Sequence, residues 1–236
     1  MKKIRKALIS VSDKKNLYLL LKNIAKYKIQ LISSGGTFKE IKKLGFKCLE
    51  VSKYTGFPEI LDGRVKTLHP KIHAGILSKR NHKSHLKDLK NNNFEEIDLV
   101  VVNFYPFEKT LESTNNHNKI IENIDVGGPT MVRAAAKNYN DVTVITKSEQ
   151  YNKFIEELNN NNGSTSIEFR QKMSEEAFTE TAYYDVLISN YFNKKSKNLF
   201  PQKKIIYGNL IEKLRYGENP HQEAAIYSES NKLNIK

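Results

Sequence analysis

The sequence contains only one cysteine, Cys48. A single thiol cannot form an internal disulfide, and it leaves no cluster of thiolates for structural zinc. The fold must therefore take its stability from a packed hydrophobic core. A chain of 236 residues, 39% apolar and 28% charged, is long enough to bury one large core or two small ones. We expect one principal domain with an appendage.

Long hydrophobic runs are also missing. Residues 17–21 form about the longest apolar run, whereas a helix that spans a bilayer needs about 20 apolar residues. The basic start at residues 2–6 is followed by a short apolar stretch that ends at Ser10, too short for the core of a signal peptide. These absences predict a cytoplasmic protein without a transmembrane segment.

Arginine is scarce in an otherwise basic chain. Lys and Arg number 39 against 26 Asp and Glu, a net charge of +13, but only six of the basic residues are Arg. A phosphate-rich partner would suit that charge. Nucleic-acid interfaces, however, rely on Arg, whose planar guanidinium makes bidentate hydrogen bonds to bases and phosphates. We therefore expect most lysines to be solvated and no specific nucleic-acid partner.

The first 148 residues alternate between strand and helix patterns. Apolar and β-branched runs predict strands at residues 7–12, 29–33, 46–51, 97–104 and 142–146. Helical spacing follows the first two strands, with Asp13 as a plausible N-cap of the first helix, and another helix is expected through residues 131–137. The run at residues 97–104 is almost unbroken, which predicts a parallel strand near the sheet centre. The alternation predicts an α/β fold with an open, doubly wound, mostly parallel sheet.

Beyond residue 148 the pattern becomes helical. Helices are expected at residues 149–158 and 167–192, separated by a breaker at residues 159–163. Residues 193–204 are polar and predict a linker, and the rest of the chain holds too few apolar residues to fold alone. We therefore expect a first domain at residues 1–192 with C-terminal helices, and a second segment at residues 193–236.

A glycine pair lies between the second strand and its helix, in the motif SSGGT at residues 33–37. Free N–H groups and the helix dipole favour an anion at such a place, although the same residues could simply make a tight turn and a cap. Lys14 follows the neighbouring strand, and open α/β sheets bind ligands at the carboxyl ends of their strands. Together these features favour a phosphate site.

Residues 55–70 form a stretch punctuated by glycine and proline that is long for a loop. Arg64, Lys66 and Thr67 would supply a guanidinium fork, an ammonium group and a hydroxyl from one short segment. Long loops held on a rigid scaffold commonly carry function. The segment is therefore predicted to contact a ligand.

Two histidines lie at the end of this segment and just after it. His69 and His73 are four residues apart, a spacing that can hold a metal on a helix. Because Pro70 lies between them and no cysteine or dense carboxylate cluster is near, structural or substrate-contacting roles are favoured. No metal site is predicted.

Polar residues also close the central strand and precede the next helix. Tyr105 follows that strand, where the alternative is an aromatic plug over the core. Asp125 precedes a glycine pair, and Lys137 lies further along the following helix. With Lys66 these residues would make a proton-transfer set, but spacing alone does not establish that they converge.

The motifs above belong to seven blocks in order along nearly the whole chain, at residues 10–14, 34–37, 63–70, 103–107, 125–128, 133–138 and 214–222. Together they resemble the amino-terminal half of the bifunctional purine-biosynthesis family that combines IMP cyclohydrolase with AICAR formyltransferase. The resemblance implies a methylglyoxal-synthase-like domain. Its reaction would close the ring of FAICAR to give IMP and water, as a cyclic amidine hydrolase without metal or cofactor.

The resemblance also implies site residues. The substrate-binding set would be Ser12, Asp13, Lys14, Ser34, Gly35, Gly36, Thr37, Arg64, Val65, Thr67, Asn103, Phe104, Val126 and Gly127. The phosphate would be held by Ser12, Lys14, Ser34 and Thr37. The residues that would contact ribose and base are Arg64, Lys66, Thr67, Asn103, Phe104, Asp125 and Val126. Lys137 matches the family's proton donor and acceptor, and its supporting polar residues match Lys66, Tyr105 and Asp125.

In the family, the segment around Arg215 begins a larger formyltransferase domain, which uses 10-formyltetrahydrofolate. Arg215, Tyr216 and His221 match part of that domain's AICAR site. In this chain we expect them to lie in a disordered tail with an incomplete site, and formyltransferase activity to be absent. The family forms homodimers, so the resemblance implies a homodimer that binds a small nucleotide and no membrane.

Three other functions are alternatives to an IMP cyclohydrolase. A regulatory nucleotide- or phosphate-binding module of the same fold could keep Lys14, Ser34 and Thr37, but it would not need the proton-transfer set. A methylglyoxal synthase would act on a triose phosphate and would not need residues 55–70. A basic nucleic-acid-binding protein would bind oligonucleotides only at low salt if its lysines acted nonspecifically.

Overall fold

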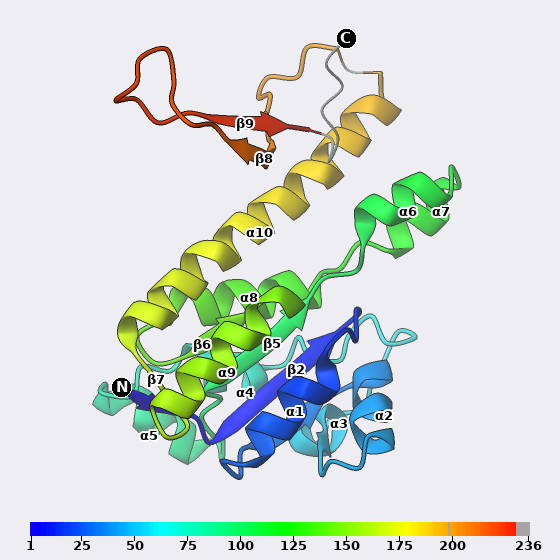
Figure 1. Ribbon diagram of the computed structural model, residues 1–236. Helices are drawn as coiled ribbons and strands as arrows, with labels where there is room; N and C mark the ends of the chain where they lie inside the picture. The colour runs from blue at the N-terminus through cyan, green and yellow to red at the C-terminus, as the bar shows by residue number, and fades with distance from the viewer. Residues whose placement is uncertain (198, 230–236) are drawn as a thin grey trace. The chain divides into compact units, whose positions relative to one another are not determined.

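The structure is a computed structural model that describes residues 1–197 and 199–229 (Figure 1). Its contacts divide the chain into two units, residues 1–182 and 183–236. The division falls within helix α10 (Ile167–Lys195). A domain boundary at residue 192 stays a prediction.

A five-stranded parallel sheet forms the centre of the first unit, which confirms the predicted fold class. The strand order is β4-β3-β2-β5-β6, and all four pairings are parallel. The strands are β2 (Lys6–Val11), β3 (Gln30–Ser33), β4 (Leu49–Glu50), β5 (Leu99–Asn103) and β6 (Thr143–Ile145). Antiparallel β1 (Lys2–Lys3) and β7 (Ser164–Thr165) form a separate pair.

Helices connect the strands. They are α1 (Leu17–Ala25), α2 (Gly35–Lys43), α3 (Val51–Thr55), α4 (Pro70–Leu77), α5 (Lys83–Asn91), α6 (Phe107–Ser113), α7 (His117–Glu122), α8 (Gly127–Lys137) and α9 (Tyr151–Asn160), with the 3₁₀ turn η1 (Ser148–Gln150). The crossover from β2 to β3 and the crossover from β5 to β6 run in opposite directions along the sheet. Right-handed crossovers of opposite direction place their helices on opposite faces. Accordingly, α1 packs beside α9, whereas α8 packs beside α4.

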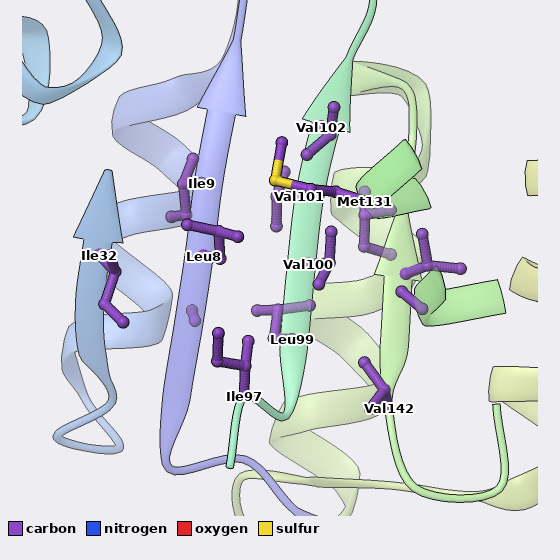
Figure 2. Packing of buried hydrophobic residues seen from close by; sticks show 14 of the residues in the cluster. Leu8, Ile9, Ile32, Ile97, Leu99, Val100, Val101, Val102, Met131 and Val142 are labelled. Atoms are coloured by element: carbon purple, nitrogen blue, oxygen red, sulfur yellow. The ribbon is translucent and has the colours of Figure 1, made fainter. Parts of the chain in front are cut away.

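The two helical layers explain the burial of β5. Leu99, Val100, Val101 and Val102 are each at most 1% exposed, because both faces of the strand are covered. Figure 2 shows these residues between Leu8 of β2 and Val142, just before β6, with Met131 of α8 against the sheet. β5 lies between β2 and β6, near the sheet centre as predicted. Within the described ranges, no helix has the length and apolar character needed to cross a membrane.

Two local predictions in the first unit were wrong. The strand expected at residues 46–51 is reduced to β4, because β3 offers it only two paired positions at the sheet edge and Val51 begins α3. The N-cap of α1 is Asn16, in the left-handed region at φ 58°. Asp13 instead accepts a hydrogen bond from the backbone N–H of Lys15, which closes a tight turn before the helix.

The helices expected after residue 148 are present as α9 and α10. The expectation of a disordered tail was wrong, because β8 (Asn209–Lys213) and β9 (Ala225–Ser228) pair antiparallel. Arg215, Tyr216 and His221 lie in the loop between them. Backbone hydrogen bonds such as Gly217 N–H to the Gln222 carbonyl close that loop locally, so it is ordered without a core of its own.

Arg170 ties the start of α10 to the end of α8. Its guanidinium is 2% exposed and donates to the backbone carbonyls of Tyr139, Asn140 and Thr165. A buried guanidinium is stable only when its donors are paired, and these carbonyls in turn need donors. The contact therefore joins α10 to β7 just before it and to the turn after α8, which lies 30 and 31 residues earlier.

We expect Arg170→Met to destabilise the protein by about 3 kcal/mol, because three buried carbonyls lose their donor. The urea midpoint, followed by far-ultraviolet circular dichroism, measures this loss. Lys172→Met is the matched control, since Lys172 is exposed on the same helix. An Arg170→Met midpoint equal to that of the control would show that these carbonyls do not depend on Arg170.

Candidate active site

A cavity of about 770 Å³ opens at the carboxyl ends of the parallel strands. This is where an open α/β sheet is expected to bind ligands. Its lining comes from the ends of β2 and β5, the start of α2, the loop before α4, and the stretch from α7 to α8. The predicted residues that line it are Ser12, Lys14, Ser34, Gly35, Gly36, Thr37, Arg64, Lys66, Thr67, Asn103, Tyr105, Asp125, Val126 and Gly127.

Cationic side chains gather over the first turn of α2. A Cβ added to Gly35 would lie 3.5 Å from Nζ of Lys66, and one added to Gly36 would lie 3.9 Å from Nζ of Lys14. Gly35 has φ +53°, a conformation that side chains rarely adopt. Ser34 is the N-cap but makes no side-chain capping bond. Two ammonium groups, a serine hydroxyl and the N–H groups of a helix start therefore share one end of the cavity, an arrangement suited to an anion.

Thr37 has a structural task at the same place. Its hydroxyl accepts from the backbone N–H of Val11 at 3.0 Å and donates to the Val11 carbonyl at 2.9 Å. The side chain thus ties α2 to the end of β2. Because the hydroxyl hydrogen is used by Val11, Thr37 can offer a ligand its backbone N–H more readily than its side chain.

Asn103 joins the loops that follow β2 and β5. Its Oδ1 accepts from the backbone N–H groups of Ser12, at 2.6 Å, and Asp13, at 3.1 Å. Its Nδ2 donates to the Asp13 carbonyl, and the Ser12 hydroxyl donates to the carbonyl of Phe104. The amide therefore organises the floor of the cavity rather than projecting freely toward a ligand.

Asp125 is a partly buried carboxylate just before α8. Burial raises its pKa, while the Gly128 N–H, donating at 2.8 Å, and the charge of Lys66 act in the opposite direction. A Cβ on Gly128 would collide with this carboxylate, and a Cβ on Gly127 would lie 2.8 Å from Oγ1 of Thr67. The glycine pair is thus required for close packing. The result is a carboxyl group that holds its proton more readily than an exposed Asp, beside an ammonium group.

Lys137 does not join the other members of the expected proton-transfer set. It lies exposed at the last position of α8 and is not among the cavity-lining residues. Ten residues of helix at 1.5 Å each separate it from Gly127 by about 15 Å. The structure therefore brings Lys66, Tyr105 and Asp125 into one cavity and leaves Lys137 outside it.

Several other predicted residues also lie outside the lining. Asp13 contributes its backbone to the Asn103 contacts, Val65 pairs with Ile60 in a short bridge, and Phe104 packs against the core. The histidines favoured for structural or substrate-contacting roles are not lining residues either. His69 caps α4 by accepting from the Lys71 N–H, and burial lowers the pKa of His73.

The sequence analysis did not identify all the residues that line the cavity. The additional lining residues are Ser10, Val11, Asp62, Gly63, Ile121, Glu122, Ile124, Gly128 and Met131. Glu122 is the charged member of α7 among them, and it pairs with Arg64. Its position just before Asp125 offered a weak signal, but only the fold shows that this short helix reaches the cavity.

Two family models match this chain. Residues 16–130 match the model of the MGS-like domain, and residues 135–236 match that of the AICARFT/IMPCHase bienzyme. In the solved structures, the chain is similar to the "Crystal structure of ForH" with a TM-score of 0.72 and 29% identity. That match covers 80% of this chain and 97% of the other.

Curated relatives give the same result along almost the whole chain. The "Bifunctional purine biosynthesis protein PurH" of Bradyrhizobium diazoefficiens is 46% identical over 98% of this chain, and that of Rippkaea orientalis is 49% identical over 94%. The chain spans about 44% of the length of these relatives. Because the two models match in succession and the relatives align across both, the chain belongs to the AICARFT/IMPCHase bienzyme family and carries an MGS-like domain.

Proposed function

We propose that this chain is an IMP cyclohydrolase, which closes the ring of FAICAR to give IMP and water. The observation that carries the proposal is one cavity that holds an anion cradle, formed by Lys14 and the first turn of α2, together with a partly buried carboxyl group, Asp125, beside Lys66. The relatives named as bifunctional purine biosynthesis proteins support the pathway. The reaction forms one carbon–nitrogen bond and expels water with no change of oxidation state, so the proposal includes no redox cofactor, and it includes no metal.

Ring closure is mainly a problem of geometry. The carboxamide nitrogen and the formyl carbon belong to one molecule, and the site must hold them in contact long enough to react. Binding the phosphate over α2, beside Lys14, would anchor one end of the nucleotide and leave Lys66 for the reacting oxygen. The base would then extend toward Tyr105 and Asp125. Freezing that geometry removes an entropic barrier that the free substrate must overcome.

The proton changes assign tasks to the remaining groups. The carboxamide nitrogen forms a bond to the formyl carbon and loses one proton, and the formamide nitrogen loses another as the ring double bond forms. The formyl oxygen takes up both protons and leaves as water. We propose that Lys66 and Tyr105 stabilise the charge on that oxygen. Asp125 would relay protons between the nitrogens and the oxygen.

The family resemblance assigns proton transfer to Lys137 as well, although Lys137 lies outside the cavity of this chain. That position favours a second candidate function, a nucleotide-binding module that keeps the anion cradle without turnover. One assay distinguishes these two functions. An enzyme converts FAICAR to IMP with or without a chelator, whereas a binding module binds IMP and forms none.

We expect Lys66→Ala to lower kcat for FAICAR by about 100-fold or more, because the charge that develops on the formyl oxygen is no longer stabilised by a positioned cation.

The assignment implied by the family predicts that Lys137→Ala lowers kcat with little change in IMP affinity, since Lys137 does not line the cavity. Steady-state kinetics and calorimetric IMP titration measure both effects. An unchanged kcat in Lys137→Ala would remove that residue from the chemistry and leave proton transfer to Asp125.

Gly128→Ala should displace the Asp125 carboxylate, because the new Cβ would collide with it. We expect a loss in kcat of about 100-fold, similar to the removal of a general acid or base. Thr130→Ala is the matched control, an exposed position on the same helix. Full activity of folded Gly128→Ala protein would show that the position of Asp125 is not critical.

The raised pKa of Asp125 also predicts a pH dependence of stability. In the folded state its ionised form is disfavoured by burial, so ionisation opposes folding above the ordinary carboxyl pKa. Asp125→Asn should therefore raise the melting temperature at about pH 7, and this gain should shrink toward about pH 4, as protonation of Asp125 removes the penalty of burying its charge. Thermal melts at both pH values test the sign, with exposed Asp88→Asn as control. A gain that grows on acidification would contradict it.

A further inference from the structure

Glu122 is a cavity-lining residue to which neither the family resemblance nor the proposed mechanism gives a task. It lies at the end of α7 and forms a two-pronged contact with Arg64, in the loop before α4. Nε of Arg64 donates to Oε1 at 3.1 Å, and Nη2 donates to Oε2. Both side chains line the cavity. The pair therefore bridges two of its walls.

The backbone that carries Arg64 is a tight turn closed on itself. Leu61 and Asp62 both have φ 54°, and Gly63 has φ 85°, so three successive residues are in the left-handed region. Ile60 and Val65 exchange backbone hydrogen bonds at 3.1 and 3.3 Å. These bonds determine where the Arg64 backbone lies, but they leave the direction of its long side chain undetermined.

Glu122 supplies that direction. A carboxylate binds a guanidinium in one plane through two parallel hydrogen bonds, which sets the orientation of the group as well as its position. The contact occupies two of the five N–H donors of Arg64 and leaves the others for a ligand. Each partner also favours the charged form of the other, since Arg64 lowers the pKa of Glu122 and Glu122 raises that of Arg64.

The exposure of the pair argues against a role in holding the fold together. The two side chains are 66% and 58% exposed, and exposed ion pairs add little to stability. A contact at the cavity rim that contributes little to folding can still restrict the rotamers of an arginine. The same carboxylate would repel a phosphate at this rim and so favour its binding at the cationic end over α2.

We propose that Glu122 is a positioning residue that orients the Arg64 guanidinium for the nucleoside part of the bound nucleotide. This inference rests on the proposed function of the cavity. It assigns to α7 the task of preparing Arg64 before the ligand arrives, so that less side-chain freedom is lost on binding.

The test compares Glu122→Gln with Glu112→Gln, an exposed carboxylate on the neighbouring helix α6 that does not line the cavity. We expect Glu122→Gln to raise KM for FAICAR about fivefold while kcat changes less than about twofold, and Glu112→Gln to match the wild type. Glu122→Asp, which keeps the charge, should recover part of the affinity. In an Arg64→Gln background, Glu122→Gln should have no further effect, because the residue acts through Arg64.

A second measurement needs no nucleotide. Amide hydrogen exchange in a peptide covering residues 60–66 should be the same in Glu122→Gln, Glu112→Gln and the wild type, since the Ile60–Val65 backbone bonds, rather than the ion pair, hold the loop. Faster exchange in Glu122→Gln, or additive effects of the Glu122 and Arg64 substitutions on KM, would overturn the inference. A wild-type protein that neither binds IMP nor converts FAICAR would instead overturn the proposed function.

Discussion

The pairing of β2 with β5 is the contact on which the cavity depends. Its parallel register sets Val11 opposite Asn103, so the two loops that follow leave the sheet side by side. The Asn103 amide then binds the backbone of Ser12 and Asp13 on both its acceptor and its donor side. Because both strands are buried by helices on two faces, their ends are held rigidly. The loops can therefore present polar groups without ordering them when a ligand binds.

Charge is distributed unevenly around this rigid frame. Lys14 and Lys66 lie over the start of α2, whereas Asp125 and Glu122 belong to the segment between β5 and α8. The glycines at α2 and α8 allow these charged groups to approach the backbone closely. A ligand with one anionic end and one neutral, hydrogen-bonding end would match this distribution. A nucleoside monophosphate has that character, which connects the electrostatics to the proposed reaction.

Local patterns predicted much of this architecture. The buried run of β5 and the glycines that begin α2 act through periodicity and backbone freedom, which are properties of a few neighbouring residues. The errors occurred where long-range pairing or local hydrogen bonds decided the outcome. The strand expected at residues 46–51 was shortened by its edge position, and the segment around Arg215 is ordered by hairpin bonds between β8 and β9.

The sequence by itself determined the parallel α/β fold, the strand ends at which ligands bind, and the residue types available there. Only the tertiary structure decided which side chains share the cavity. It placed Glu122 beside Arg64, although the two are far apart along the chain, and it left Lys137 at the far end of α8. The physical reason is that spacing along a helix or loop specifies a direction and a rise per residue. The meeting of two side chains depends on how separate elements pack, which no single segment encodes.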